Sequence, residues 1–177
     1  MSGQRQTTLS CRCGGVTMQA TGEPIMRSVC YCKSCQAAGR RINALPGAPP
    51  VLGQDGGTDY VLYRKDRIRC IVGGDKLDGF RLLPTSPTRR MVASCCNSAM
   101  FLDFGKAHWL TVYTGRVPEP RPPLTARVMT AARPDGVVLP NDAPSYPGQA
   151  GGFMLKLLKA WLAMGFRVPR VEGVPYP

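Results

Sequence analysis

Histidine is nearly missing from this chain of 177 residues, in which His108 is the only one. A metal site built on several imidazoles is therefore excluded. Acidic residues are also scarce, with 11 Asp and Glu against 23 Lys and Arg, so the formal net charge is +12. The basic residues form no long Lys/Arg block, and we expect no nucleic-acid partner. An anionic small-molecule substrate fits the same charge.

Long apolar runs are absent as well. The N-terminus, MSGQRQTTLSCRC, has no apolar segment of the kind found in signal peptides. The most apolar stretch, residues 152–166, is too short to cross a bilayer and contains Lys156 and Lys159. We therefore expect a cytoplasmic protein without a membrane span, in which the eight cysteines stay reduced.

The common catalytic and nucleotide-binding motifs are not found: there is no G-x-G-x-x-G, phosphate-binding loop, H-E-x-x-H or G-x-S-x-G. The chain instead has 20 glycines and 17 prolines, which favour short strands and turns over long helices. Hydrophobic residues make up 44% of the chain, enough for a core. These features predict a mainly β fold.

Strand-like patterns divide the chain into a regular and a less regular part. We expect strands at 7–10, 16–20, 25–29, 61–63, 68–72, 80–83, 88–94 and 108–113, and a short helical turn near Ser34. The pattern predicts a β domain over residues 7–117 and a Pro-rich extension over 118–177, packed on it. The extension holds one amphipathic helix near 152–165, which either packs on the core or meets a partner or membrane surface.

Cysteine is the residue type with the clearest pattern. Seven of the eight cysteines fall into three tight groups with spacings C-x-C, C-x-C-x-x-C and C-C: Cys11 and Cys13; Cys30, Cys32 and Cys35; Cys95 and Cys96. Close pairs on turns supply the ligands of tetrahedral zinc sites. An iron–sulfur cluster is the alternative, but two C-x-C pairs fit it poorly. We therefore predict two zinc ions.

Seven thiolates cannot fill two four-coordinate zinc sites. Structural zinc sites are closed, whereas catalytic sites keep one position for water or substrate. A division into four and three ligands leaves one open site. The alternative is that both sites are closed, with Cys70 or a carboxylate as the eighth ligand. Cys70 also reads as a small buried apolar residue.

The cysteine motifs resemble those of a known family. CRCGGV at 11–16, CYCKSCQ at 30–36 and a distal cysteine pair before Met100-Phe101 are similar to the glutathione-dependent formaldehyde-activating (GFA) family, over about residues 8–105. This resemblance implies a zinc-binding β fold of the Mss4-like kind. It also implies a structural zinc site at Cys11, Cys13 and Cys96, with Cys95 as a candidate fourth ligand.

The second zinc site of the family is the one linked to catalysis and glutathione, and the resemblance places it at Cys30, Cys32 and Cys35. The distal motif departs from the family pattern C-x-x-C-G, because Ala93 stands at the first cysteine position and Asn97 replaces the glycine. The form S-C-C-N resembles a subgroup of bacterial GFA-related proteins.

The resemblance implies a carbon–sulfur lyase-type enzyme that acts on glutathione or other thiol adducts of small aldehydes. Zinc held by three thiolates has a net charge of −1, so it suits a further thiolate better than Lewis-acid catalysis. Arg40 and Arg41 are candidate contacts for glutathione carboxylates, as are Arg89 and Arg90, which otherwise read as solvated surface residues. The alternatives are a non-catalytic zinc-stabilised binding module and a redox or metal-storage protein.

Three other polar residues have two interpretations each. Tyr31, between two cysteines, could line the open site. His108 could be a general base, but its apolar surroundings favour a structural role. Asp55 could orient another group, although the sequence Asp-Gly-Gly is typical of a turn.

Overall fold

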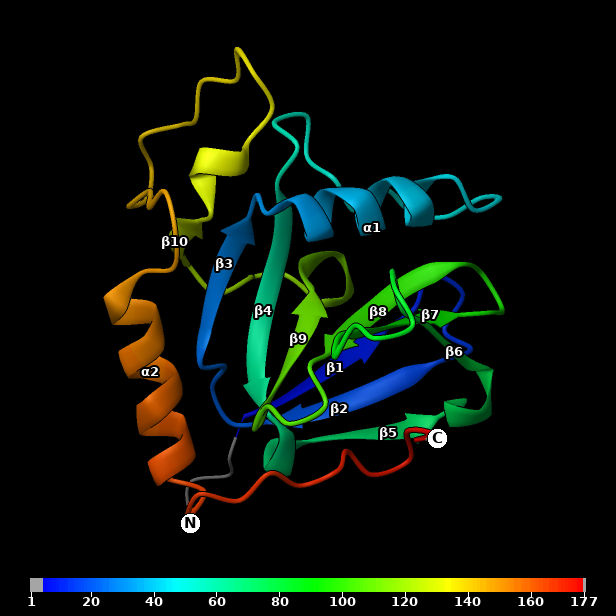
Figure 1. The fold of residues 1–177 in the computed structure, drawn as a ribbon. Helices are drawn as coiled ribbons and strands as arrows, with labels where there is room; N and C mark the ends of the chain where they lie inside the picture. The colour runs from blue at the N-terminus through cyan, green and yellow to red at the C-terminus, as the bar shows by residue number, and fades with distance from the viewer. Residues whose placement is uncertain (1–4, 177) are drawn as a thin grey trace.

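Two β-sheets and two α-helices make up the protein in the computed structural model, which describes residues 5–176 (Figure 1). The smaller sheet has the order β1-β2-β5: Gln6–Ser10, Thr17–Thr21 and Ile68–Val72. The larger has the order β10-β3-β4-β9-β8-β7-β6: Leu124–Val128, Met26–Cys30, Thr58–Arg64, Trp109–Tyr113, Ser98–Asp103, Arg89–Ala93 and Leu77–Phe80. The expectation of a mainly β fold is confirmed, and the arrangement is consistent with a GFA or Mss4-like fold.

Each face of the larger sheet buries its own apolar cluster. One cluster fills the space between the two sheets and includes Leu9, Met18, Val61 and Phe101. The other lies under the helices α1 (Lys33–Asn43) and α2 (Gly151–Leu162). Val61 and Leu62 are neighbours in β4 but belong to different clusters, as expected from the alternation of side chains along a strand. The core therefore has two layers with the larger sheet between them.

Helix α1 is longer than the short turn that the sequence predicts near Ser34. Gly39 in its middle lowers helix propensity, which weakens the signal. The buried residues Cys35, Ala38, Gly39 and Ile42 nevertheless repeat at helical spacing and pack inward. At Gly39 a β-carbon would lie 2.5 Å from Leu52, so only glycine fits this contact. Tertiary packing thus extends the helix beyond its local preference.

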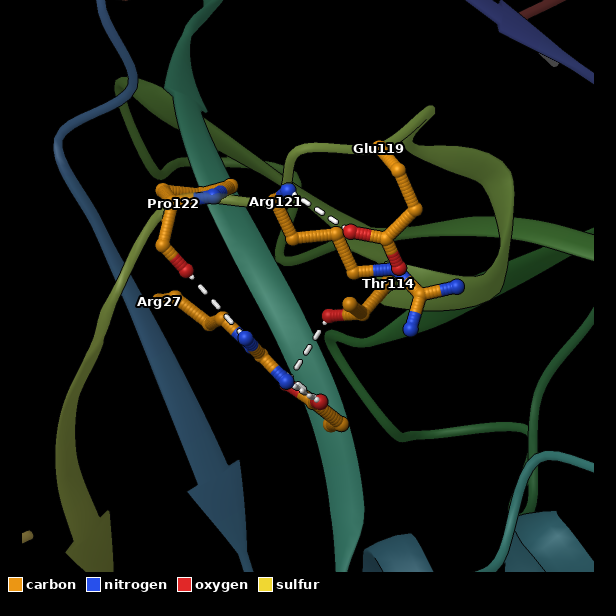
Figure 2. Close-up of polar contacts among 6 residues, drawn as sticks. Arg27, Thr114, Glu119, Arg121 and Pro122 are labelled. Atoms are coloured by element: carbon orange, nitrogen blue, oxygen red, sulfur yellow. Dashed lines mark hydrogen bonds and ion pairs between the residues drawn. The ribbon is translucent and has the colours of Figure 1, made fainter. Parts of the chain in front are cut away.

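Strand β10 was not expected, because prolines surround it in the sequence. It pairs in parallel with β3, and Val128 lies opposite Cys30. The segment before it is held by Arg27 of β3, which donates to the Pro122 carbonyl at 3.2 Å and forms an ion pair with Asp59 at 2.7 Å (Figure 2). The Thr114 hydroxyl donates to the same carboxylate at 2.8 Å. The chain after Pro118 therefore contributes a strand to the larger sheet, while a division at residue 117 remains a prediction.

Two element boundaries differ from the expectation. Strand β6 ends at Phe80, where pairing with Arg90 of β7 stops, so a strand at 80–83 is wrong. Strand β8, after the cysteine pair, is separate from β7. Helix α2 ends at Leu162, close to the expected position, and lies beside β3 and β10 (Figure 1). Among residues 5–176, no helix has both the length and the apolar character needed to cross a membrane.

Candidate metal centres

Four sulfur atoms meet where the β1–β2 turn approaches the β7–β8 turn. We call Cys11, Cys13, Cys95 and Cys96 the four-thiol group; their Sγ atoms all lie within 4.8 Å of one another. The Sγ–Sγ distances are 3.6 Å for Cys11–Cys13, 3.8 Å for Cys11–Cys95, 3.3 Å for Cys13–Cys95 and 4.0 Å for Cys95–Cys96. A tetrahedron with Zn–S bonds of about 2.3 Å has S–S edges of about 3.8 Å. The four sulfurs therefore have the spacing of a closed zinc site.

Adjacent cysteines can share this site because the next residue turns the chain sharply. Asn97 has a φ of 54°, in the left-handed region where asparagine is one of the few tolerated side chains. Its side-chain amide donates to the Pro46 carbonyl at 2.9 Å, which holds the turn. Asn97 stands where the GFA pattern has glycine, a residue that adopts the same conformation. The structure thus brings Cys95 together with the other three thiols.

The first turn is tightly built around its sulfurs. The backbone N–H of Val16 donates to Cys11 Sγ at 3.2 Å, and Gly14 has a φ of 77°. A β-carbon at Gly15 would lie 3.0 Å from Cys95 Sγ, so a side chain there would crowd the approach of the two turns. Burial opposes ionisation of Cys96, but hydrogen bonds from the Ser98 hydroxyl and from backbone N–H groups lower its pKa to about 6. The β7–β8 turn therefore favours the thiolate of Cys96, the form that binds metal, whereas burial and hydrogen bonds with the neighbouring thiols raise the pKa of Cys95 to about 12.

The second set of thiols comes from one short stretch of chain. We call Cys30, Cys32 and Cys35 the three-thiol group; their Sγ atoms lie within 4.8 Å of one another, and no other Cys, His, Asp or Glu of the described residues joins them. Cys30 ends β3, Cys32 is the N-cap of α1 and accepts from the Cys35 N–H at 3.3 Å, and Cys35 is buried in the first turn. The strand-to-helix junction thus holds three sulfurs together.

The three thiols differ in acidity because they share hydrogen bonds. Donation from Cys30 and Cys35 lowers the pKa of Cys32, and the backbone N–H groups of Cys35 and Ser34 add to the effect. The pKa of Cys30 is raised, because its thiol is the donor and because it is buried. The N-terminus of a helix favours an anion at the position that Cys32 occupies. Cys32 is therefore the preferred thiolate before metal binds.

Two residues from distant strands complete the surroundings of the three-thiol group. The Tyr60 hydroxyl donates to Cys35 Sγ at 3.6 Å, and the Tyr60 ring lies 5.1 Å from that of Tyr113. Arg90 is only 1% exposed, and its Nη2 donates to the Ser34 hydroxyl at 2.8 Å in the first turn of α1. Spacing along the chain gives no signal for Tyr60, which contacts a cysteine 25 residues away.

Tyr31 and Asp55 form a hydrogen-bonded pair, and the Tyr31 side chain is not exposed at the three-thiol group. Tyr31 is fully buried, and its hydroxyl donates to Asp55 Oδ2 at 2.5 Å. Burial and then Asp55 raise the pKa of Tyr31 well above its usual range. Asp55 Oδ1 also accepts from the Gly57 N–H at 2.9 Å, so the Asp-Gly-Gly turn is present. Asp55 therefore both closes the turn and fixes the position of the Tyr31 hydroxyl.

The remaining candidates lie elsewhere. Cys70 joins neither thiol group; its Sγ donates to the Val72 carbonyl at 3.3 Å. His108 is buried against α2, with Nε2 2.8 Å from the Leu157 carbonyl and its ring stacked on Trp161. This position fits the structural interpretation of His108.

The arginine candidates separate into different environments. Arg40 and Arg41 are exposed in the last turn of α1, and the Arg41 guanidinium lies 4.4 Å from the centre of the Phe80 ring. Arg89 donates to the Pro175 carbonyl at 2.7 Å, whereas Arg90 is buried beside α1. The expectation of a solvated surface residue is therefore wrong for Arg90, because β7 turns its side chain under the helix.

Fold and site together define a mainly β protein with two thiol groups that could each hold a metal ion. Its N-terminal part is GFA-like: the family model of the glutathione-dependent formaldehyde-activating enzyme matches residues 6–45. The match contains the whole three-thiol group and two cysteines of the four-thiol group.

Solved structures include a protein that is similar to this chain. A crystal structure of a Rhodobacter sphaeroides protein is similar with a TM-score of 0.46 and 16% sequence identity, covering 65% of this chain and 91% of that chain. A search of curated proteins finds no match.

Proposed function

We propose that this protein binds two zinc ions and that the three-thiol group is the active site of a carbon–sulfur lyase-type reaction. The substrate is glutathione or another small thiol together with its adduct with a small aldehyde. The observation that carries the proposal is the unequal ligand count, four thiols in one group and three in the other. The four-thiol group makes a closed structural site, and the three-thiol group leaves one position for a substrate.

The donor atoms fit zinc. Thiolates are soft ligands that select zinc among the common divalent ions, and the four-thiol group has the spacing of a tetrahedral site. Zinc bound at Cys30, Cys32 and Cys35 would hold the substrate sulfur as a fourth thiolate. A reducing, cytoplasmic setting would keep these thiols available.

The surrounding residues support a thiolate-rich centre. Three thiolates and one Zn²⁺ carry a net negative charge, which rises further when a substrate thiolate joins. The first turn of α1 and the buried Arg90 guanidinium beside it place positive potential next to this charge. The Tyr60 hydroxyl donates to Cys35 and withdraws charge from that sulfur. These contacts favour an anionic site over a neutral one.

The proposed reaction balances without an oxidant or reductant. In the forward direction the substrate thiolate attacks the aldehyde carbon, a carbon–sulfur bond forms and the carbonyl π bond opens. The oxygen takes one proton from water and becomes a hydroxyl. In the reverse direction the hydroxyl loses that proton, the carbonyl reforms and the thiolate leaves.

Arg40 and Arg41 remain our proposed contacts for substrate carboxylates. Arg40 lies five residues beyond Cys35, about 8 Å along the helix axis and about 140° around it, so a tripeptide bound through its sulfur would reach Arg40 by passing around α1. Arg40 is exposed, and no ion pair holds it within residues 5–176. Arg41 is the next residue of α1, and its guanidinium is held against the ring of Phe80 in β6.

A non-catalytic zinc-stabilised module is the second candidate. It is favoured by the way Cys32 caps α1 while Cys35 is buried in the core cluster, because these contacts would also suit a purely structural metal staple. In that case the fourth position holds water or a fixed group and does not exchange with thiols.

Metal stoichiometry and thiol binding separate the two candidates. The native protein, reduced, should contain two zinc ions by elemental analysis, and Cys32→Ser should contain one. Cobalt should then replace zinc, and glutathione should change the ligand-field absorption of the native protein but not that of Cys32→Ser. Exchange between free formaldehyde and its glutathione adduct, followed by NMR, should accelerate with native protein only. Two metals without a glutathione response would instead support the structural module.

A further inference from the structure

Helix α2 has a second apolar face that the protein does not cover. Phe153 and Leu157, and Met164 just after the helix, point inward. A different stripe points outward: Met154, Leu155, Leu158 and Leu162, each between 45% and 53% exposed. The spacing of these four residues places them on one side of the helix. An apolar stripe of this kind in water marks a contact surface.

The outward stripe forms one wall of a groove. Lys106, Ala107 and Trp109 provide the opposite wall, Trp161 and the buried His108 lie between, and the hollow has a volume of about 690 Å³. Aromatic rings extend the surface at both ends: Phe104 lies 5.9 Å from Trp109, and Phe166 lies 5.1 Å from Trp161 between ring centroids. Both phenylalanines are exposed. The apolar surface is therefore continuous from β8 to the end of α2.

The charges along the chain segment that contains α2 have one sign. From residue 143 to residue 171 the sequence contains no Asp or Glu, and it contains four basic residues: Lys156, Lys159, Arg167 and Arg170. All four are exposed, as is Lys106 at the edge of the groove. Asp66 reaches this region through Arg64, which donates to the Ala163 carbonyl, but its carboxylate is already paired with Arg64 at 2.6 Å. The surface thus combines exposed leucines and aromatic rings with lysines that form no ion pair within residues 5–176.

We propose that the outward face of α2, with the Phe104–Trp109 segment, docks on the surface of an anionic lipid bilayer. Helices that lie in a membrane interface combine Leu, Phe and Trp on the buried side with Lys and Arg beside them. The lysines of α2 contact headgroup phosphates while Leu155 and Leu158 enter the acyl boundary. This docking is independent of the proposed reaction, because neither thiol group takes part in it.

Charge decides between a lipid surface and a second copy of the chain. A symmetric dimer through this face would bring the lysines of both helices together, and each chain carries a formal net charge of +12. Like charges of this size oppose association, whereas an anionic surface attracts them. An acidic protein with an apolar ridge would satisfy the same charges, and it is an outcome that the experiment below can recognise.

The two tryptophans of the chain, Trp109 and Trp161, both line the groove and report on docking directly. With vesicles containing phosphatidylserine, tryptophan emission should shift to the blue and the protein should cosediment. Phosphatidylcholine vesicles should give neither effect, and high salt should reverse both. Brominated acyl chains should quench the emission, which shows insertion to the acyl boundary rather than adsorption.

Matched variants test which side chains matter. Lys156→Gln with Lys159→Gln should weaken partitioning roughly 30-fold, because each lysine near an anionic surface contributes about fivefold to binding. Leu155→Gln with Leu158→Gln should weaken it at least tenfold and abolish quenching. Leu83→Gln with Val138→Gln, which changes exposed apolar residues outside this face, should leave binding unchanged. Circular dichroism should show all three variants folded.

Three results would overturn the proposal. The first is the absence of partitioning by the native protein. The second is equal binding of the native protein and the Leu155→Gln, Leu158→Gln variant, which would assign adsorption to general surface charge. The third is a dimer by light scattering that the leucine changes dissociate while vesicles have no effect, which would assign the face to a second copy. If an acidic protein is the true occupant, the native protein should fail the vesicle assay.

Discussion

The two thiol groups bring sulfur atoms together across very different separations along the chain. In the four-thiol group, Cys11 meets Cys95 across 84 residues and joins the smaller sheet to the β7–β8 turn of the larger. In the three-thiol group, all sulfurs come from one junction between β3 and α1. A metal in the first group closes a long loop, whereas a metal in the second closes almost none. From this difference we expect a metal in the first group to act on stability, and we propose the second for chemistry.

The environments of the sulfurs follow the same division. Backbone turns and the Ser98 hydroxyl surround the four-thiol group, which has the number of sulfurs that a tetrahedral site needs. Side chains from distant strands surround the three-thiol group, with the Tyr60 hydroxyl on Cys35 and the buried Arg90 beside the helix start. Side chains of both kinds can tune the charge of a sulfur.

The largest effect should follow from breaking the long-range group. Cys11→Ser removes a buried sulfur that accepts the Val16 N–H, so the two sheets lose their metal cross-link. We expect loss of one zinc and of about 3 kcal/mol or more in the free energy of unfolding. Urea unfolding and metal analysis check this, with Cys70→Ser as the control for loss of a thiol outside both groups. Unchanged stability would remove the structural role of the group.

A smaller loss of stability should follow from a substitution in the three-thiol group. At Cys32, a serine can replace the cysteine as the N-cap of α1. Cys32→Ser keeps a good N-cap for α1, and Cys32→Ala does not. Both variants should lose one zinc, but Cys32→Ala should lose about 1 kcal/mol more stability than Cys32→Ser. Thermal melts of the two proteins without metal measure this difference. With zinc present, a Cys32→Ser melt as low as that of Cys11→Ser would contradict the division between the groups.

The difference between the two thiol groups can be predicted only in part from the sequence, because some of their contacts depend on how the strands pair. The cysteine spacing is local information, and it correctly predicted that seven thiols form groups. Alternating apolar residues likewise predicted most of the strands. The contact of Tyr60 with Cys35, the entry of β10 beside β3 and the burial of Arg90 depend on how strands pair, and spacing carries none of this. Asn97 was visible as a departure, but its left-handed φ explains it only in the structure.

A third and milder change probes the side chains near the three-thiol group. Tyr60→Phe removes the hydroxyl that donates to Cys35, while Tyr113→Phe removes a buried hydroxyl without a hydrogen-bond partner in residues 5–176. We expect Tyr60→Phe to cost about 1 kcal/mol and to weaken metal binding about fivefold, measured by chelator competition. Tyr113→Phe should be neutral or slightly stabilising. Equal effects from both variants would argue against a specific role for the Tyr60 hydroxyl.

The smallest effect concerns acidity. Hydrogen bonds from Cys30 and Cys35 lower the pKa of Cys32, whereas that of Cys96 is lowered only to about 6. In metal-free protein at pH 5, about a tenth of Cys96 should be thiolate, while Cys32 should remain ionised. Alkylation followed by mass spectrometry should therefore label Cys32 and largely spare Cys96 at this pH.

The same shifts give the direction in which pH changes the contributions of Cys32 and Cys96 to stability. Both pKa values lie below the unfolded value of about 8.5, so their contribution to metal-free stability is full above that pH. It is lost as pH falls through each folded-state value, which for Cys96 is about 6. Equal alkylation of Cys32 and Cys96 at every pH down to 5 would show that the two thiol groups do not differ in acidity.

The different spans of the two groups also separate them in time. A ribosome completes the three-thiol group at Cys35 and needs about 60 further residues before it adds Cys96. At about 5–20 residues per second, this interval lasts several seconds. During it the emerging chain already offers three clustered thiols but only half of the other group. If both groups bind metal as we propose, the first ion to meet the nascent chain finds the three-thiol group complete, and the four-thiol group collects its metal only as the sheets close.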